Sequence, residues 1–212
     1  MAGAKICGLS TPETVQAAID GGAAFLGFNF FDKSPRFVTP ETAARLARPA
    51  GGKTTVVAVT VDPDDDLLDR LCAILKPDLI QLHGKENPAR AGEIARRTGA
   101  GLIKALPVST SADLDAARAF DGLVDHLMFD AKPPADSELP GGTGATFDWT
   151  LLTGRRFERP YLLAGGLDPW NVSGALRQSG APFADVSSGV ERGPGIKDPG
   201  LISAFLEAVR RA

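Results

Sequence analysis

The sequence predicts an α/β protein, a (β/α)₈ TIM barrel in a single domain over residues 1–212, on three observations. Eight short apolar runs occur along the chain, and most are continuous rather than alternating, which is typical of strands covered on both faces. Helical stretches join most of these runs, and 212 residues lie just above the lower size limit of about 200 for this fold. The G-x-G-x-x-G that a doubly wound open sheet carries after its first strand is absent. We therefore favour the barrel over the open sheet.

Each apolar run predicts one strand, and recurring pairs of a polar residue and proline predict helix starts. The polar side chain can accept a hydrogen bond from a free amide at the helix start, and proline has no amide that needs a partner there. In chain order, the runs are 4–6, 25–30, 55–61, 79–82, 102–106, 126–129, 161–164 and 183–186. The pairs are Thr11-Pro12, Thr39-Pro40, Asp62-Pro63, Asn87-Pro88, Asp168-Pro169 and Asp198-Pro199. The stretches 67–75 and 201–209 are predicted to be helical.

The composition excludes several classes of protein. A hydrophobic content of 43% allows a large core, and a net charge of −3 gives no electrostatic reason to expect nucleic acid. The first residues lack the features of a signal peptide, and no apolar run approaches the roughly 18 residues of a membrane span, so we expect a cytoplasmic protein. The two cysteines form no CxxC pair and the two histidines lack metal-ligand spacing, so we expect neither a disulfide framework nor a metal.

The first predicted strand ends beside a cysteine. Cys7 directly follows the run 4–6 and lies four residues before the helix start at Thr11. In a barrel, polar residues at the C-terminal ends of strands are functional, whereas those at the other end serve stability. Cys7 is therefore a candidate catalytic residue, although a lone cysteine commonly acts as a small buried hydrophobe. Cys72 lies in the apolar pattern of 67–75, which predicts a buried, inert thiol.

Two further strand ends carry groups that can contact a substrate. The second run leads into a loop with Arg36, a candidate anion clamp whose apolar and aromatic neighbours suit an aromatic acid. The fourth run is followed by His83, which we expect to shape the pocket or bond locally, because two strands separate it from Cys7. Lys104 lies within the fifth strand. His126 opens the sixth strand, far from its functional end, so we expect a structural role.

The sixth strand is followed by a carboxylate, Asp130. A charge directly after apolar residues is unfavourable unless it is paired or used in catalysis. Dry surroundings favour the protonated form of a carboxyl group and would let Asp130 act as a general acid near neutral pH. The alternative is an aspartate that caps the loop after the strand.

Three glycine-bearing turns follow strands six, seven and eight. The first lies near the end of a long loop, 132–146, and loops of this length in a compact domain are usually functional. Barrels commonly bind phosphate on the exposed backbone amides of their last loops. The three turns in this order therefore predict a phosphate site. They contribute Gly142, Thr143, Gly144, Gly165, Gly166, Ser188 and Gly189.

Taken together in this order, the motifs resemble those of the phosphoribosylanthranilate isomerase family, cofactor-free isomerases of tryptophan biosynthesis. The resemblance covers nearly the whole chain, and the ordered set carries it rather than any one motif. Two departures are visible, at 59–63, where the family has a more aromatic strand end, and at 129–131, where the context of the acid is slightly altered. The matching motifs are Lys5-Ile6-Cys7-Gly8, 27–38 with Ser34-Pro35-Arg36, Gln81-Leu82-His83-Gly84, Gly142-Thr143-Gly144, 163–167 and 185–191.

The resemblance implies an Amadori rearrangement of N-(5-phosphoribosyl)anthranilate to 1-(2-carboxyphenylamino)-1-deoxyribulose 5-phosphate, without cofactor or metal. It implies that Asp130 protonates the furanose ring oxygen, and that Cys7 then removes the C2 proton of the resulting Schiff base. Arg36 would hold the anthranilate carboxylate, His83 would line the substrate site, and the glycine turns would hold the phosphate. Because Cys7 must act as a thiolate, we expect the cationic Schiff base, Lys5 or a helix N-terminus to lower the pKa of the thiol.

Two alternatives from other classes stay open at this point. Another phosphate-binding barrel enzyme, such as an indoleglycerol-phosphate synthase or a pentose-phosphate epimerase, would keep the glycine turns but not the pairing of Cys7 with Asp130. A non-catalytic phosphosugar-binding or thiol-sensing barrel would keep the fold without turnover. As partners we expect the small-molecule substrate and, in a homodimer, a second copy of the chain, with no nucleic acid and no membrane.

Overall fold

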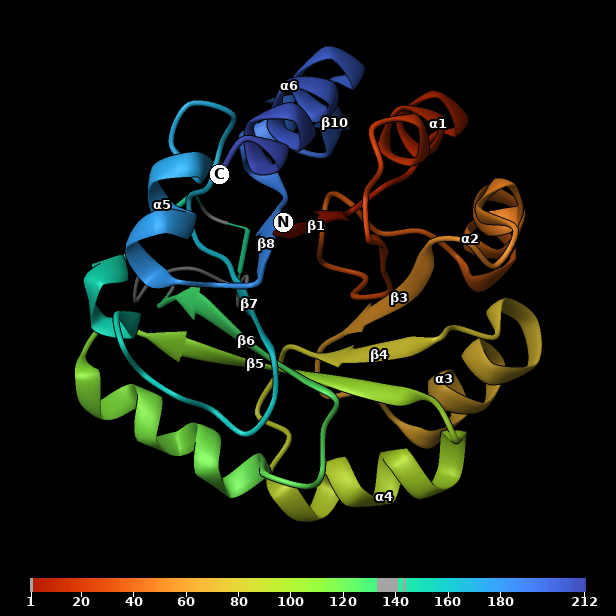
Figure 1. The fold of residues 1–212 in the computed structure, drawn as a ribbon. Coiled ribbons are helices and arrows are strands. Elements are labelled where there is room, and N and C mark those ends of the chain that lie inside the picture. The colour runs from red at the N-terminus through yellow and green to blue at the C-terminus, as the bar shows by residue number, and fades with distance from the viewer. Residues whose placement is uncertain (1, 133–140, 143) are drawn as a thin grey trace.

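The computed structural model describes residues 2–132, 141–142 and 144–212. Eight parallel strands pair in sequence order, and β8 closes on β1, so the predicted barrel is confirmed (Figure 1). Each predicted run coincides with one strand, with ends that differ by no more than two residues. The strands are β1 (Gly3–Cys7), β2 (Phe25–Asn29), β3 (Thr55–Thr60), β4 (Leu79–Leu82), β5 (Gly101–Val108), β6 (His126–Ala131), β7 (Tyr161–Leu163) and β8 (Phe183–Val186).

Helices surround the barrel (Figure 1). Those after β5 and β6 are 3₁₀ helices rather than α-helices, and α3 continues into a π-helical turn. The α-helices are α1 (Pro12–Asp20), α2 (Pro40–Ala47), α3 (Asp65–Arg70), α4 (Pro88–Thr98), α5 (Val172–Ser179) and α6 (Pro199–Arg210). The other helical segments are η1 (Arg48–Ala50), η2 (Leu71–Leu75), η3 (Ser111–Phe120), η4 (Trp149–Leu152) and η5 (Ser188–Val190). Between η5 and α6, β9 (Glu191–Gly193) and β10 (Ile196–Lys197) form an antiparallel hairpin.

Four of the six predicted helix starts are confirmed: Thr11, Thr39, Asn87 and Asp198 each accept a hydrogen bond from an amide of the first helical turn.

The other two helix starts are wrong. Asp62 has a left-handed backbone (φ 45°) and accepts a hydrogen bond from the amide of Lys85, so α3 begins only after Asp64. Asp168 accepts from the amides of Trp170 and Asn171 and forms a turn, which delays α5. In both cases an aspartate serves a loop instead of a helix.

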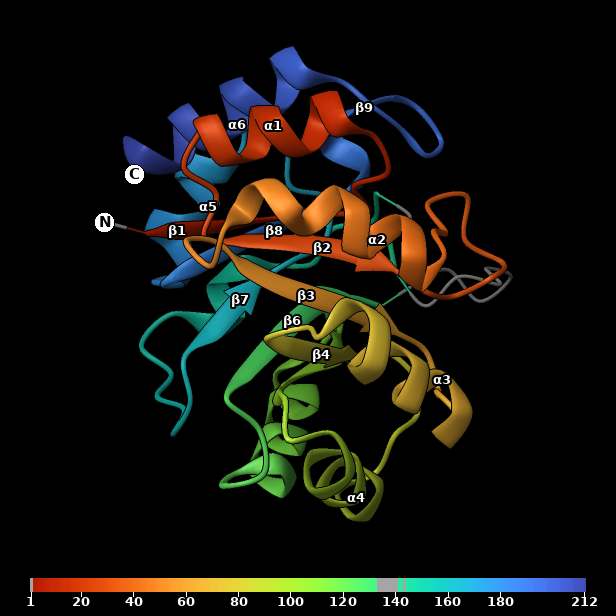
Figure 2. The same ribbon diagram turned by 90° about the vertical axis from the view of Figure 1, so that its right-hand side faces the viewer.

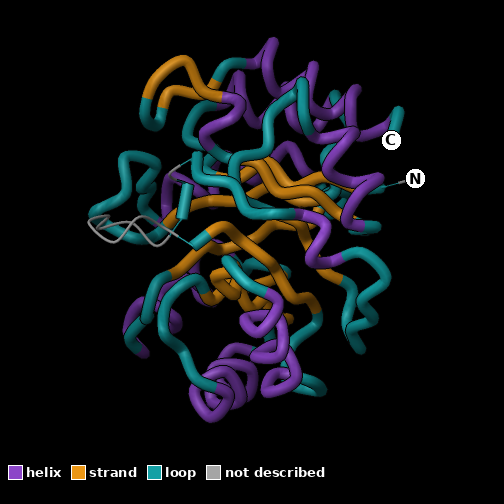
Figure 3. The backbone as a smooth tube through the Cα atoms, turned by 90° about the vertical axis from the view of Figure 1, so that its left-hand side faces the viewer, coloured by secondary structure: helices purple, strands orange, loops and turns teal. Residues whose placement is uncertain are grey.

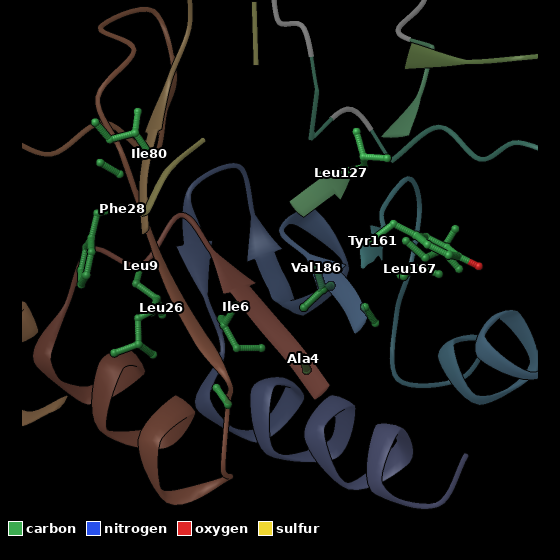
Figure 4. Close-up of a cluster of buried hydrophobic side chains, with 14 of the residues drawn as sticks. Ala4, Ile6, Leu9, Leu26, Phe28, Ile80, Leu127, Tyr161, Leu167 and Val186 are labelled. Carbon is green, nitrogen blue, oxygen red and sulfur yellow. The ribbon is translucent and has the colours of Figure 1, made fainter. Parts of the chain in front are cut away.

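Alternation along each strand separates two apolar shells. In β1, Ala4 and Ile6 face outward and pack beneath the helices with residues such as Leu26 (Figure 4). Cys7 belongs instead to the cluster inside the barrel, together with Met128 of β6. Because successive strand residues point to opposite faces, every strand supplies both shells. The barrel interior is therefore filled with side chains, and the chemistry is confined to its ends.

The C-terminal ends of the strands point away from the chain termini (Figure 2). The loops after the strands and the β9–β10 hairpin gather at this end (Figure 3). Among the helices that the structure describes, none has the length and apolar character that crossing a membrane requires.

Candidate active site

One pocket lies at the C-terminal end of the barrel, and it gathers five predicted site residues, namely Gly142 and four with ionisable side chains. Cys7 comes from β1, Arg36 from the loop after β2, His83 from the end of β4, and Asp130 from β6. The remaining lining residues are Asn29, Phe31, Ser34, Val59, Val61, Gly141, Gly142, Asp185 and Ser187. A thiol, a carboxyl, an imidazole and a guanidinium thus face one space.

Cys7 is the last residue of β1, and its thiol lies beside a buried ion pair. The Nζ of Lys5 lies 2.8 Å from the Oδ1 of Asp185 on β8, and Lys5 is fully buried. Gly27 leaves room for this ammonium, because a Cβ there would lie 3.1 Å from the Lys5 Nζ. Burial raises the pKa of the Cys7 thiol above its ordinary value, and the charge of Lys5 offsets this rise only in part. Lys5 thus lowers the pKa of Cys7, as expected, but not enough to outweigh burial in the free protein.

Asp130 is buried and is contacted by a histidine. Its Oδ2 lies 3.2 Å from the Nε2 of His83, while its Oδ1 accepts a hydrogen bond from the amide of Ala131. The other ring nitrogen of His83, Nδ1, lies 2.7 Å from the Nε2 of Gln81. Since an amide NH₂ donates, this assignment leaves the Nε2 of neutral His83 protonated and directed at Asp130.

The contact between His83 and Asp130 was not predicted from the sequence, which weighed His83 only against Cys7. The signal was present: in a barrel, side chains from alternate strands share a layer, and β4 and β6 are alternate strands. Gln81 could be found in the same way, because it precedes His83 by two residues and so points to the same face.

Arg36 is held by a carboxylate that the sequence analysis had not given a role. Its Nε and Nη2 donate to the two oxygens of Glu191, at 2.8 and 2.9 Å, and Nη2 also donates to the carbonyl of Gly142. In the described part of the chain, Nη1 has no hydrogen-bond partner, and Arg36 lines the pocket beside Phe31 and Val59. The guanidinium is therefore fixed along one edge, with an apolar and aromatic wall next to it.

A second pocket adjoins the first, with Asp130, Gly142, Asp185 and Ser187 lining both. Backbone from all three predicted glycine turns surrounds it, and the turn after β8 is the short helix η5, an arrangement common at phosphate sites of barrels. Thr143 lies outside the described residues. The predicted residues that line this pocket are Gly142, Gly144, Gly165, Gly166 and Ser188.

Glycine is required at these positions for different structural reasons. Gly165 and Gly166 have φ of 88° and 63°, and a Cβ on Gly166 would lie 2.2 Å from the Cγ2 of Thr146. Gly189 does not line the pocket. A Cβ there would lie 1.9 Å from the carbonyl oxygen of Leu167, so Gly189 lets the turns after β7 and β8 pack together.

The remaining histidine and cysteine lie away from the pocket. His126 is at the opposite end of the barrel, where its ring packs edge-on against Phe25 and Phe183. Cys72 lies in the helical stretch as predicted, but it is half-buried rather than buried. Burial raises the pKa of the Cys72 thiol.

Comparisons with known proteins agree on one family. A family model described as N-(5'-phosphoribosyl)anthranilate (PRA) isomerase matches residues 4–208. The chain is 70% identical to the N-(5'-phosphoribosyl)anthranilate isomerase of Caulobacter vibrioides (99% of this chain, 96% of the relative), and 51% identical to that of Mesorhizobium japonicum (98% and 95%).

Solved structures give the same picture. Phosphoribosyl anthranilate isomerase from Thermotoga maritima superimposes with a TM-score of 0.88 at 33% identity, covering all of both chains. A phosphoribosyl anthranilate isomerase solved with reduced 1-(o-carboxyphenylamino)-1-deoxyribulose 5-phosphate gives a TM-score of 0.85 at 30% identity, again over both whole chains.

Proposed function

Since this chain belongs to the N-(5'-phosphoribosyl)anthranilate isomerase family and has that activity in tryptophan biosynthesis, we propose that Asp130 is its general acid and Cys7 its general base. Asp130 delivers a proton to the furanose ring oxygen, and the sugar opens to a cationic Schiff base. Cys7 then takes the proton from C2, which leaves an enolamine that tautomerises to the ketone. The observation that carries this proposal is the pocket that Cys7 and Asp130 line from different strands.

The two adjoining pockets suggest how the substrate lies. The phosphate occupies the pocket of glycine turns, and the anthranilate occupies the pocket with Arg36 and Phe31. The ribose then spans the region where Asp130 and Asp185 line both pockets. This places the reacting carbons of the sugar between the acid and the base, as proton transfer to and from one substrate requires.

His83 is proposed to position the carboxyl group of Asp130. Its Nε2 lies 3.2 Å from the Asp130 Oδ2, so the ring can hold this oxygen by a hydrogen bond. Gln81 holds the opposite side of the ring, at 2.7 Å from Nδ1, and keeps the imidazole in this orientation. His83 therefore acts through Asp130, and its contact with substrate stays a prediction.

Cys7 has to become a thiolate during turnover. Burial keeps the thiol protonated in the free protein by raising its pKa. A cationic Schiff base in the same pocket favours the thiolate, as a neighbouring positive charge does in other reactive cysteines. Lys5 supports this step, because burial lowers its pKa but Asp185 and Cys7 raise it more, so it stays an ammonium.

The test of this function is the loss of substrate fluorescence when the purified protein is mixed with phosphoribosylanthranilate. We expect turnover without added cofactor. An indoleglycerol-phosphate synthase, a pentose-phosphate epimerase or a non-catalytic sugar-binding barrel would leave this substrate unchanged. Whether the chain is a monomer or a homodimer stays a prediction; one solved relative is described as monomers generated from the dimeric isomerase of Thermotoga maritima.

Arg36→Ala should raise KM far more than it lowers kcat. A hydrogen bond to a charged group contributes about 1.5–3 kcal/mol, so kcat/KM should fall by about ten- to a hundredfold. The measurement is steady-state kinetics with phosphoribosylanthranilate. Unchanged kinetic constants would remove Arg36 from the binding site.

Inorganic phosphate should compete with the substrate and stabilise the folded protein. A ligand at a hundred times its Kd contributes about 2.7 kcal/mol, which raises the Tm of a chain of this size by about 5–10 °C. Gly166→Ala should abolish this rise, because Gly166 lines the pocket and has a positive φ. Gly174→Ala is the matched control, since its Cβ meets no atom within 4 Å. An equal rise in both variants would refute the placement of the phosphate.

A further inference from the structure

A buried row of three charges lies behind the first pocket. Glu191 is the first residue of the β9–β10 hairpin, and it binds Arg36 on one side and the Nζ of Lys197 on the other. The side chains are 6% (Arg36), 4% (Glu191) and 1% (Lys197) exposed. The Lys197 Nζ also donates to the carbonyl and the hydroxyl of Ser187, whose hydroxyl donates to the carbonyl of Cys7. One ammonium thus connects the proposed carboxylate clamp to the strand end that carries the thiol.

The row carries one positive charge in excess. Arg36 and Lys197 are cations and Glu191 is the only acid within ion-pair distance of either among the described residues. Buried charge that lacks an opposite charge is strongly unfavourable. With an anion bound at the Nη1 of Arg36, the row would hold two positive and two negative charges. Without Lys197, the same anion would face a guanidinium already neutralised by Glu191, and would bring an uncompensated negative charge into the protein.

We propose that Lys197 is a positioning residue for the Arg36 clamp, and that its charge makes the buried row selective for a ligand with an aromatic carboxylate. The inference rests on the proposed role of Arg36 and extends it to a residue that does not line either pocket. Burial lowers the pKa of Lys197, with a further lowering from the charge of Arg36, against the opposing effect of Glu191. An anion bound nearby therefore stabilises the charged form of Lys197.

The experiment compares two ligands by titration calorimetry. One is reduced 1-(o-carboxyphenylamino)-1-deoxyribulose 5-phosphate, and the other carries a phenylamino group in its place and so lacks only the carboxylate. The full-length wild type is compared with Lys197→Gln, which keeps hydrogen-bonding capacity but loses the charge, and with Lys197→Met as a second neutral variant. We expect the wild type to bind the carboxylated ligand more tightly. Each Lys197 variant should bind that ligand about tenfold more weakly than the wild type, equivalent to about 1.4 kcal/mol. The affinity for the other ligand should fall by less than about twofold.

Lys104→Gln is the matched control. Lys104 is also a buried ammonium, with its Nζ 2.7 Å from Glu86, but it points away from the barrel interior and lines neither pocket. Its variant should keep the ligand preference of the wild type. A merely structural role for Lys197 would weaken both ligands equally, and that result overturns the inference.

Arg36→Ala separates the inference from the proposed function. If Arg36→Ala abolishes the preference while both Lys197 variants retain it, the clamp stands and the role of Lys197 is refuted. If the wild type binds both ligands equally, the role of Arg36 in the proposed function fails, and the inference fails with it.

Discussion

Asp130→Asn should lower kcat by about 10²–10⁴-fold, the usual contribution of a general acid, while the barrel stays folded. Asparagine has nearly the shape of aspartate, and its amide oxygen can still accept the hydrogen bond from the amide of Ala131. It cannot deliver a strongly acidic proton to the ring oxygen of the sugar. The measurement is the rate of fluorescence loss from phosphoribosylanthranilate at saturation, together with a thermal melt.

The control lies at the other end of the same strand. Asp125 precedes β6, and its Oδ2 accepts a hydrogen bond from the amide of Leu102 at the N-terminal end of the barrel. Asp125→Asn should therefore change stability at most and leave kcat as in the wild type. If Asp130→Asn kept more than about a tenth of the wild-type kcat, the acid would have to be another group.

Cys7→Ala should produce a loss of the same order, about 10²–10⁴-fold in kcat, because no other thiol lies in the described pocket. Alanine removes only the sulfur from a side chain in the interior cluster, so the fold should persist. Cys72→Ala provides the control, since Cys72 lies outside both pockets. Full activity in Cys7→Ala would return Cys7 to the role of a small buried hydrophobe.

The pH dependence of the wild type follows from the raised pKa of Cys7. Because burial shifts this pKa upward, the thiol of the free enzyme is protonated at neutral pH, and its thiolate fraction increases as the pH rises. The value of kcat/KM should therefore increase with pH from the acid side. In Cys7→Ser, kcat/KM should not rise with pH in this way, since a serine hydroxyl does not titrate in the pH range of the assay.

The sequence was sufficient for the fold because the strands are short, apolar and buried on both faces. Their positions depend on local composition, and closure of eight such units follows from their number. Helix starts were predicted correctly where the polar residue caps the helix and proline is its first residue, as at Thr39-Pro40. The prediction failed at Asp62 and Asp168, because both carboxylates bind amides of loops and the helix begins later.

The members of the pocket were also predictable, since the ends of parallel strands meet at one face. The pairing inside the pocket was not. Asp130 and His83 are 47 residues apart, and Arg36 and Glu191 are 155 residues apart. Which acid meets which base depends on strand alternation and on the path of the β9–β10 hairpin, and neither is a local property of the sequence. The sequence named Lys5 as a group that lowers the pKa of Cys7, but it could not show that burial outweighs this effect.

The assignment of Cys7 as the general base and Asp130 as the general acid is tested most directly with a substrate that carries deuterium at C2 of the ribose. Only the step assigned to Cys7 breaks the bond to this atom. In Cys7→Ser, where the base is weakened, we expect the deuterated substrate to turn over more slowly than the protiated one. In Asp130→Asn, where ring opening limits the rate, both substrates should turn over equally. The opposite pattern, with an isotope effect in Asp130→Asn and none in Cys7→Ser, would contradict the assignment of the acid and the base.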